Sequence, residues 1–259
     1  MSDHIKKYKD RLKLNGNDTG EAYANNTTAF IDATFHASPS FNVVEVMSSH
    51  RPDITKIDTR IVEVERMGSL REVLFRPKQY LDIGTYIKFD GDYWIVSDLW
   101  GNKEFTSRAL VQRCNHELKW ATSPDWKNDS SKILSFPCLA SQSPIGSKAT
   151  QGKNDIGFNR YDVMLPSGQL FVYAEYNDYT KQIELNQRFI FGDNVYEIYG
   201  IDNASSADSN GIGIVQLLAK LTTKKDTDDF ENKVAFNKEQ ENVDNGINVA
   251  NNEERGRIW

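Results

Sequence analysis

The sequence is short of cysteine and of long apolar runs. Only two cysteines, Cys114 and Cys138, occur among 259 residues, which is too few for a disulfide scaffold and suits a reducing compartment. No apolar run approaches the roughly 20 residues that a membrane-spanning helix needs. The first residues, MSDHIKKYKDRLKLNG, also lack the apolar stretch of a secretory signal. We therefore expect neither a disulfide-rich secreted protein nor a membrane protein.

Positive charge is also in deficit. Lys and Arg total 31 against 37 Asp and Glu, so the formal net charge is −6. A protein that binds nucleic acid through an overall basic surface is therefore unexpected, although a local basic patch is compatible with this balance.

Motifs for catalysis and metal binding are scarce as well. None of the four histidines lies in an H-E-x-x-H pattern, and His116, two residues after Cys114, has no second Cys/His pair for zinc. Cys114 lies on a predicted strand, which favours a buried, unreactive thiol. Asp228 and Asp229 lack the spacing of a calcium loop and are expected to be solvated. We expect no catalytic residue, no metal, no cofactor and no enzyme activity.

The chain begins with a predicted amphipathic helix and polar lead over residues 1–24. Ile5, Tyr8 and Leu12 form one narrow apolar stripe. The opposite face carries the basic residues Lys6, Lys7, Lys9, Arg11 and Lys13. This helix either packs on a neighbouring β-structure with its basic face in water, or is held for a partner such as an acidic protein surface or DNA phosphates.

From residue 27 the pattern is typical of short strands separated by turns. Strands are predicted at residues 27–35, 41–47, 54–64, 71–75, 86–89, 93–96, 105–120, 133–139, 161–165, 170–176, 188–191, 195–201 and 212–221. Asp90-Gly91 between apolar arms is a strong hairpin signal. The polar residues 121–131 indicate a domain boundary, and residues 141–159 a mobile loop that carries Lys148 and Lys153.

These elements predict a mainly β protein with two tandem small β-barrel or sandwich domains, a short N-terminal helix and an extended C-terminal arm. The predicted parts are residues 1–24, 25–122, 123–222 and 223–259. The last part is too polar to offset its own ordering entropy. Its terminal Ile258-Trp259 is either an anchor that docks elsewhere or a frayed end.

The two predicted domains look related to each other. Residues 81–98 resemble residues 185–202, and residues 110–112 resemble residues 214–216, in each case at an offset of 104 positions. This regularity predicts an internal duplication. The alternative is convergence, since tight β-hairpins share a similar composition.

Four segments together resemble the head–tail connector (head-closure, neck) structural proteins of tailed bacteriophages of Gram-positive hosts. They are IKKYKDRL at 5–12, LDIGTYIKFDGDYWIV at 81–96, RALVQRCNHELKW at 108–120 and GIVQLLAKLTTKKDTDD at 213–229. The resemblance covers roughly residues 3–230 and is one of composition and order. It implies a non-enzymatic β-barrel virion protein that forms a homo-oligomeric ring between the portal or adaptor and the tail.

The resemblance also implies head completion in the host cytoplasm, contact with portal, adaptor and tail proteins, passing contact with genomic DNA, and no membrane. Some such proteins block the exit of DNA. The residues we expect at interfaces are Lys6, Lys7, Arg11, Lys148, Lys153, Ile258 and Trp259. One alternative is another phage structural protein, of the tail, the baseplate or the capsid decoration. A second is a carbohydrate-binding or hydrolytic β-protein that uses Trp94 and Trp100, which burial of these side chains would exclude.

Overall fold

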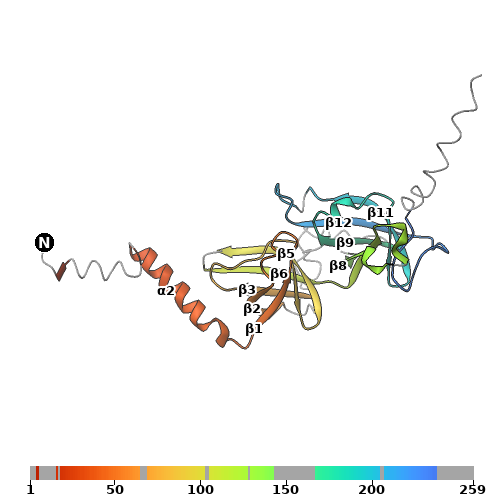
Figure 1. The fold of residues 1–259 in the computed structure, drawn as a ribbon. Helices are drawn as coiled ribbons and strands as arrows, with labels where there is room; N and C mark the ends of the chain where they lie inside the picture. The colour runs from red at the N-terminus through yellow and green to blue at the C-terminus, as the bar shows by residue number, and fades with distance from the viewer. Residues whose placement is uncertain are drawn as a thin grey trace, which may run out of the picture. The chain divides into compact units, whose positions relative to one another are not determined.

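The computed structural model describes residues 4–5, 16, 18–64, 69–102, 105–127, 129–142, 167–204 and 207–237. The protein is mainly β, as predicted, with two six-stranded barrel-like sheets preceded by a helix (Figure 1). One compact unit comprises Met1–Arg113 and Asp208–Ile214, and the other comprises Cys114–Ala207 and Val215–Trp259.

In the first unit, six antiparallel strands close into a barrel. They are β1 (Phe41–Met47), β2 (Lys56–Glu63), β3 (Leu70–Phe75), β4 (Tyr86–Phe89), β5 (Asp92–Asn102) and β6 (Thr106–Arg113). Their order is β1-β2-β3-β6-β5-β4, and β4 pairs with β1 to close the barrel. Because successive side chains alternate between the two faces of a strand, Val44, Ile87 and Val96 point into one shared core.

The second unit has its own sheet and core. Its strands are β7 (His116–Ala121), β8 (Ile133–Ser141), β9 (Gln169–Glu175), β10 (Arg188–Phe191), β11 (Asn194–Asp202) and β12 (Ile214–Thr222). Short 3₁₀ turns are η2 (Pro124–Lys127), η3 (Ser130–Lys132) and η5 (Thr180–Gln182). The order is β10-β11-β12-β9-β8-β7, and the edge strands β10 and β7 contact each other. Leu118, Phe189 and Ile198 belong to the buried core of this unit.

The helix that leads into the first barrel is α2 (Thr19–Thr34), followed by the 3₁₀ turn η1 (Phe35–Ala37). The side chain of Asp18 caps it by accepting a 2.8 Å hydrogen bond from the backbone N–H of Glu21. The strand predicted at residues 27–35 is therefore wrong. The helix predicted before residue 17 lies almost wholly outside the described residues. The two described residues at its start, His4 and Ile5, are helical. No helix in the described part of the chain is long and apolar enough to cross a membrane.

The predicted strand at residues 105–120 is also wrong, because β6 and β7 belong to different sheets. The units part between Arg113 and Cys114, upstream of the polar residues 121–131. Those residues instead connect β7 to β8, which pair as one antiparallel hairpin. A polar segment after a strand marks the end of that strand, but it does not distinguish a hairpin loop from a linker.

The remaining predicted strands within the described residues are confirmed, and β1 and β10 have the predicted bounds. The strand predicted at residues 161–165 lies outside the described residues, as does nearly all of the loop predicted at 141–159.

The two sheets share one strand order, as the predicted internal duplication requires. Counted from β4, the first sheet runs β4-β5-β6-β3-β2-β1, and the second runs β10-β11-β12-β9-β8-β7. The hairpins also share a register. Tyr86 of β4 pairs with Ile95 of β5. At an offset of 102 positions, Arg188 of β10 pairs with Glu197 of β11.

The entry to each hairpin repeats the same backbone hydrogen bond. The N–H of Gly84 donates to the carbonyl of Val96 at 2.9 Å, and the N–H of Asn186 donates to the carbonyl of Ile198 at 2.7 Å. Gly84 and Asn186 both have a positive φ, of 88° and 69°. In each unit the register between the second strand of the hairpin and the strand that follows shifts directly after the residue whose carbonyl accepts this bond, Val96 in β5 and Ile198 in β11. The two sheets therefore share their strand order, the register of this hairpin and the hydrogen bond at its entry.

The predicted offset of 104 positions lies between two values that the structure gives. The hairpins correspond at 102 positions, whereas Val111 of β6 and Ala219 of β12, which face equivalent residues, differ by 108. The connection between β11 and β12 is therefore longer than that between β5 and β6.

After β12 the chain folds back on β10 over residues 223–237, which we call the strap. Val234 and Ala235 are each 1% exposed, and Ala235 packs with Ile190 of β10 and Val195 of β11. The side chain of Asp228 is 0% exposed. The first part of the predicted polar arm therefore packs against β10, and the prediction that Asp228 is solvated is wrong. Residues 238–259 lie outside the described residues.

Candidate interaction surface

The interface residues predicted from sequence are not tested by the structure. Lys6, Lys7, Arg11, Lys148, Lys153, Ile258 and Trp259 all lie outside the described residues. Within the described residues, two other features stand out as surfaces for a partner. They are one face of α2 and a pocket on the outside of the first barrel.

Helix α2 buries none of its residues. Tyr23 is 74% exposed and Phe30 is 70% exposed. Figure 1 shows α2 with its C-terminal end beside the strands of the first unit. A helix of a globular protein normally buries one apolar face. Two exposed aromatic rings on a helix that buries none of its own residues within the described part of the chain are therefore a candidate contact surface.

The exposed rings belong to a regular stripe. Tyr23, Thr27, Phe30 and Thr34 follow one another at intervals of four, three and four residues, which places them on one side of the helix. The hydroxyls of Thr27 and Thr34 donate to the carbonyls of Tyr23 and Phe30, at 2.9 and 2.8 Å. Because these two hydroxyls are satisfied within the helix, Thr27 and Thr34 can meet an apolar surface without leaving a donor unpaired. We call these four residues the aromatic stripe.

The C-terminal end of α2 is fixed to the barrel through Phe35, which is 1% exposed. The guanidinium groups of Arg60 and Arg76 lie 4.6 and 5.2 Å from the centre of the Phe35 ring. Arg60 also donates to the carbonyls of Thr34 and Phe35, at 2.7 and 2.9 Å. These bonds satisfy carbonyls that every helix end leaves free. We call this arrangement the anchor of α2.

Arg76 adds two ion pairs to the anchor. Its guanidinium lies 2.7 Å from Asp32 of α2 and 2.8 Å from Asp58 of β2. The hydrogen bond to Asp32, together with that to Asp58, raises the pKa of Arg76 despite partial desolvation. The direction of α2 is therefore set by a charged and aromatic cluster at its base.

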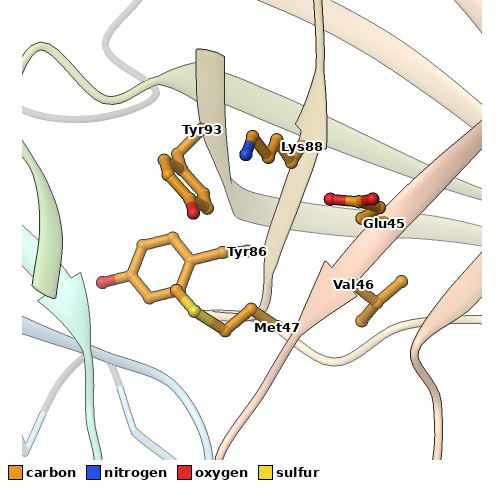
Figure 2. A pocket seen from close by; sticks show the side chains of 6 residues that line it. All are labelled: Glu45, Val46, Met47, Tyr86, Lys88 and Tyr93. Carbon is orange, nitrogen blue, oxygen red and sulfur yellow. The ribbon is translucent and has the colours of Figure 1, made fainter. Parts of the chain in front are cut away.

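The pocket has a volume of about 210 Å³ and lies where β1, β4 and β5 adjoin (Figure 2). Its lining residues are Glu45, Val46, Met47, Tyr86, Lys88 and Tyr93. Figure 2 shows the Met47 side chain beside the Tyr86 ring, with Tyr93 and Lys88 on neighbouring strands. The ammonium of Lys88 lies 5.2 Å from the centre of the Tyr93 ring.

The size of the pocket limits what can occupy it. Sites for drug-sized ligands and cofactors usually enclose about 300–1,000 Å³. A dry cavity of about 150 Å³ is enough to hold a benzene ring. The pocket therefore fits one aromatic side chain better than it fits a cofactor.

Trp94 and Cys138 are buried, so neither side chain is available to a ligand at the surface. Trp94 is 3% exposed and stacks on Phe89 at 4.6 Å between ring centres, so it cannot contribute to the exposed platform that the carbohydrate-binding alternative needs. Trp100 is 39% exposed. Burial raises the pKa of the Cys138 thiol well above its ordinary value, with a smaller effect from Cys114, which keeps that thiol protonated and unreactive at neutral pH. Cys114 is half-buried rather than fully buried as predicted.

Comparison with known proteins finds one family model that is similar to part of the second unit. Residues 116–220, from the start of β7 to near the end of β12, match the YomX C-terminal domain, a phage-associated family. No curated protein matches the chain. Among solved structures, K. pneumonia MrkH in its apo state aligns with 8% identity over 86% of this chain and 93% of that chain, at a TM-score of 0.21. A score this low carries no argument about fold or function.

Proposed function

We propose that the chain is a structural protein of a phage virion, in the head–tail connector or neck. There it forms a homo-oligomeric ring that joins the portal or adaptor to the tail and helps to retain DNA. It acts through shape and association, without catalysis or a cofactor. The observation that carries this proposal is helix α2, whose aromatic stripe has no cover in its own chain over the described residues.

Three further observations support this proposal. The second unit matches a phage-associated domain. Each unit is a small closed or nearly closed sheet, which is suited to repeated side-by-side packing because it offers few free strand edges. The formal net charge of −6 suits a conduit for DNA, since weak repulsion keeps phosphates off the wall.

A second phage role, in the tail, the baseplate or the capsid decoration, would use the same contact surface. It differs from the first in where the protein sits on the particle. Gold-labelled antibody against the protein should mark the neck between head and tail. Label at the tail tip or over the capsid surface would favour the second role.

The direct test combines the purified full-length chain with the portal protein of the same phage. Negative-stain images should show rings on the portal. A chain that stays monomeric with and without the portal, and that is absent from purified virions, would exclude both roles.

A further inference from the structure

Within one copy, the aromatic stripe and the pocket lie at opposite ends of β1. Helix α2 joins β1 at Phe41, whose ring packs on Phe35 of the anchor at 6.3 Å between centres. The pocket is lined by Val46 and Met47 at the other end of the strand. A strand rises about 3.3 Å per residue, so about 20 Å of β1 separates Phe41 from Met47.

The anchor prevents α2 from folding back over this distance. Arg60 holds the carbonyls of Thr34 and Phe35, where α2 passes into the 3₁₀ turn, and Arg76 holds Asp32 in the last turn of α2. For the stripe to reach its own pocket, these bonds and the burial of Phe35 would have to be lost. An aromatic stripe that fills the pocket must therefore belong to another molecule.

The stripe and the pocket are complementary in size and chemistry. Phe30 presents one aromatic ring, and the pocket has room for one. Met47 and two tyrosines line the pocket, and a thioether and an aromatic ring attract each other. The helical segment 18–34 has no Lys or Arg and carries Asp18, Glu21 and Asp32, a charge that suits Lys88 at the pocket but not Glu45.

We infer that α2 of one copy docks on the first unit of the next copy, with Phe30 inserted into the pocket formed by β1, β4 and β5. The inference rests on the proposed function, since it specifies the contact between neighbours in the ring. This contact joins two different surfaces, so each copy inserts its helix into one neighbour and accepts the helix of another in its pocket. Such a head-to-tail contact repeats and closes when the rotation per copy divides a full turn.

The first test compares single substitutions in the full-length chain by light scattering after gel filtration. Phe30→Glu removes the inserted ring, and Met47→Trp fills the pocket. Each should raise the dissociation constant of self-association at least about tenfold, as loss of one aromatic anchor does. Ala29→Glu is the matched control, since it places the same charge on a different face of α2, and it should assemble like the unaltered chain. All three positions are exposed, so the melting temperature should stay unchanged.

The second test mixes the two defective variants. Phe30→Glu keeps an intact pocket, and Met47→Trp keeps an intact helix, so one productive contact can form between them. The mixture should give dimers and nothing larger. Unimpaired self-association of Met47→Trp alone would overturn the inference, because α2 would then dock elsewhere.

The failure of this contact can be told apart from the failure of the proposed function. If both variants enter virions and label the neck like the unaltered chain, the inference is wrong and the connector role stands. If the unaltered chain never self-associates and never enters virions, the connector role itself is wrong.

Discussion

Arg188 of β10 and Asp228 of the strap form a two-pronged ion pair inside the second unit. Nη1 and Nη2 of Arg188 donate to Oδ1 and Oδ2 of Asp228, each at 2.9 Å. The two side chains are 7% and 0% exposed. The same guanidinium donates to the carbonyls of Phe236 and Thr223, at 3.0 and 2.8 Å. One buried cation thus fastens both ends of the strap to β10.

Removing the Asp228 carboxylate should destabilise the second unit strongly. Asp228→Ala leaves Arg188 buried without its counter-charge, and breaking a buried pair in this way costs about 3–5 kcal/mol. Urea unfolding followed by tryptophan fluorescence measures the loss. Asp226→Ala changes an exposed carboxylate on the same strap and should alter the free energy of unfolding by less than about 0.5 kcal/mol. Equal effects of the two substitutions would contradict the role of the ion pair.

The same carboxylate should make stability sensitive to acid. Burial favours a raised pKa for Asp228, but hydrogen bonds from the N–H groups of Lys225 and Phe236 and from Arg188 outweigh it and hold the pKa below its ordinary value. A lowered folded-state pKa stabilises the fold above the unfolded-state value of about 3.9, and this contribution is lost as the pH falls through the folded-state pKa. The urea midpoint should therefore drop below about pH 4. Asp228→Asn should flatten that part of the profile, and an unchanged slope would argue against the assignment.

The strands of both sheets follow from the sequence because half-buried strands alternate polar and apolar residues. Helix α2 does not follow as easily. Thr27, Thr28 and Ile31 are β-branched and imitate a strand, but the threonine hydroxyls bond to carbonyls four residues earlier, which a helix accommodates. The missed signal was Asp18 followed three residues later by Glu21, a helix-capping pattern.

The pocket and the strap depend on contacts between residues far apart in the sequence. Met47 lies opposite Tyr86 only because β4 pairs with β1 to close the barrel, and no local sequence pattern predicts that pairing. Arg188 and Asp228 are 40 positions apart. Tyr86 occupies the place of Arg188 in the first unit, so the duplication itself gives no hint of a buried ion pair.

Truncation should separate the strap from the residues that follow it. Deletion of residues 232–259 removes the buried Val234 and Ala235 together with Asn237, which accepts a 2.6 Å hydrogen bond from the N–H of Arg188. This deletion should lower the melting temperature of the second unit by several degrees, as a loss of about 2–3 kcal/mol does. Deletion of residues 238–259 leaves all of these contacts in place. Any effect of this shorter deletion on assembly, with an unchanged melting temperature, then measures association alone. Equal melting temperatures for the two truncated chains would show that the strap contributes little.

Gly84 should tolerate substitution less well than Gly91, although both have a positive φ, of 88° and 83°. A Cβ at Gly84 would collide with the carbonyl of Gly213, whereas a Cβ at Gly91 would meet no atom within 4 Å. Gly91→Ala should cost about 1–2 kcal/mol, the price of a left-handed backbone alone, and Gly84→Ala distinctly more. Gly84→Asn isolates the collision, because asparagine adopts this backbone at the equivalent position, Asn186, where φ is 69°. If Gly84→Asn folds with the stability of the unaltered chain in urea, close packing against Gly213 is not what requires glycine there.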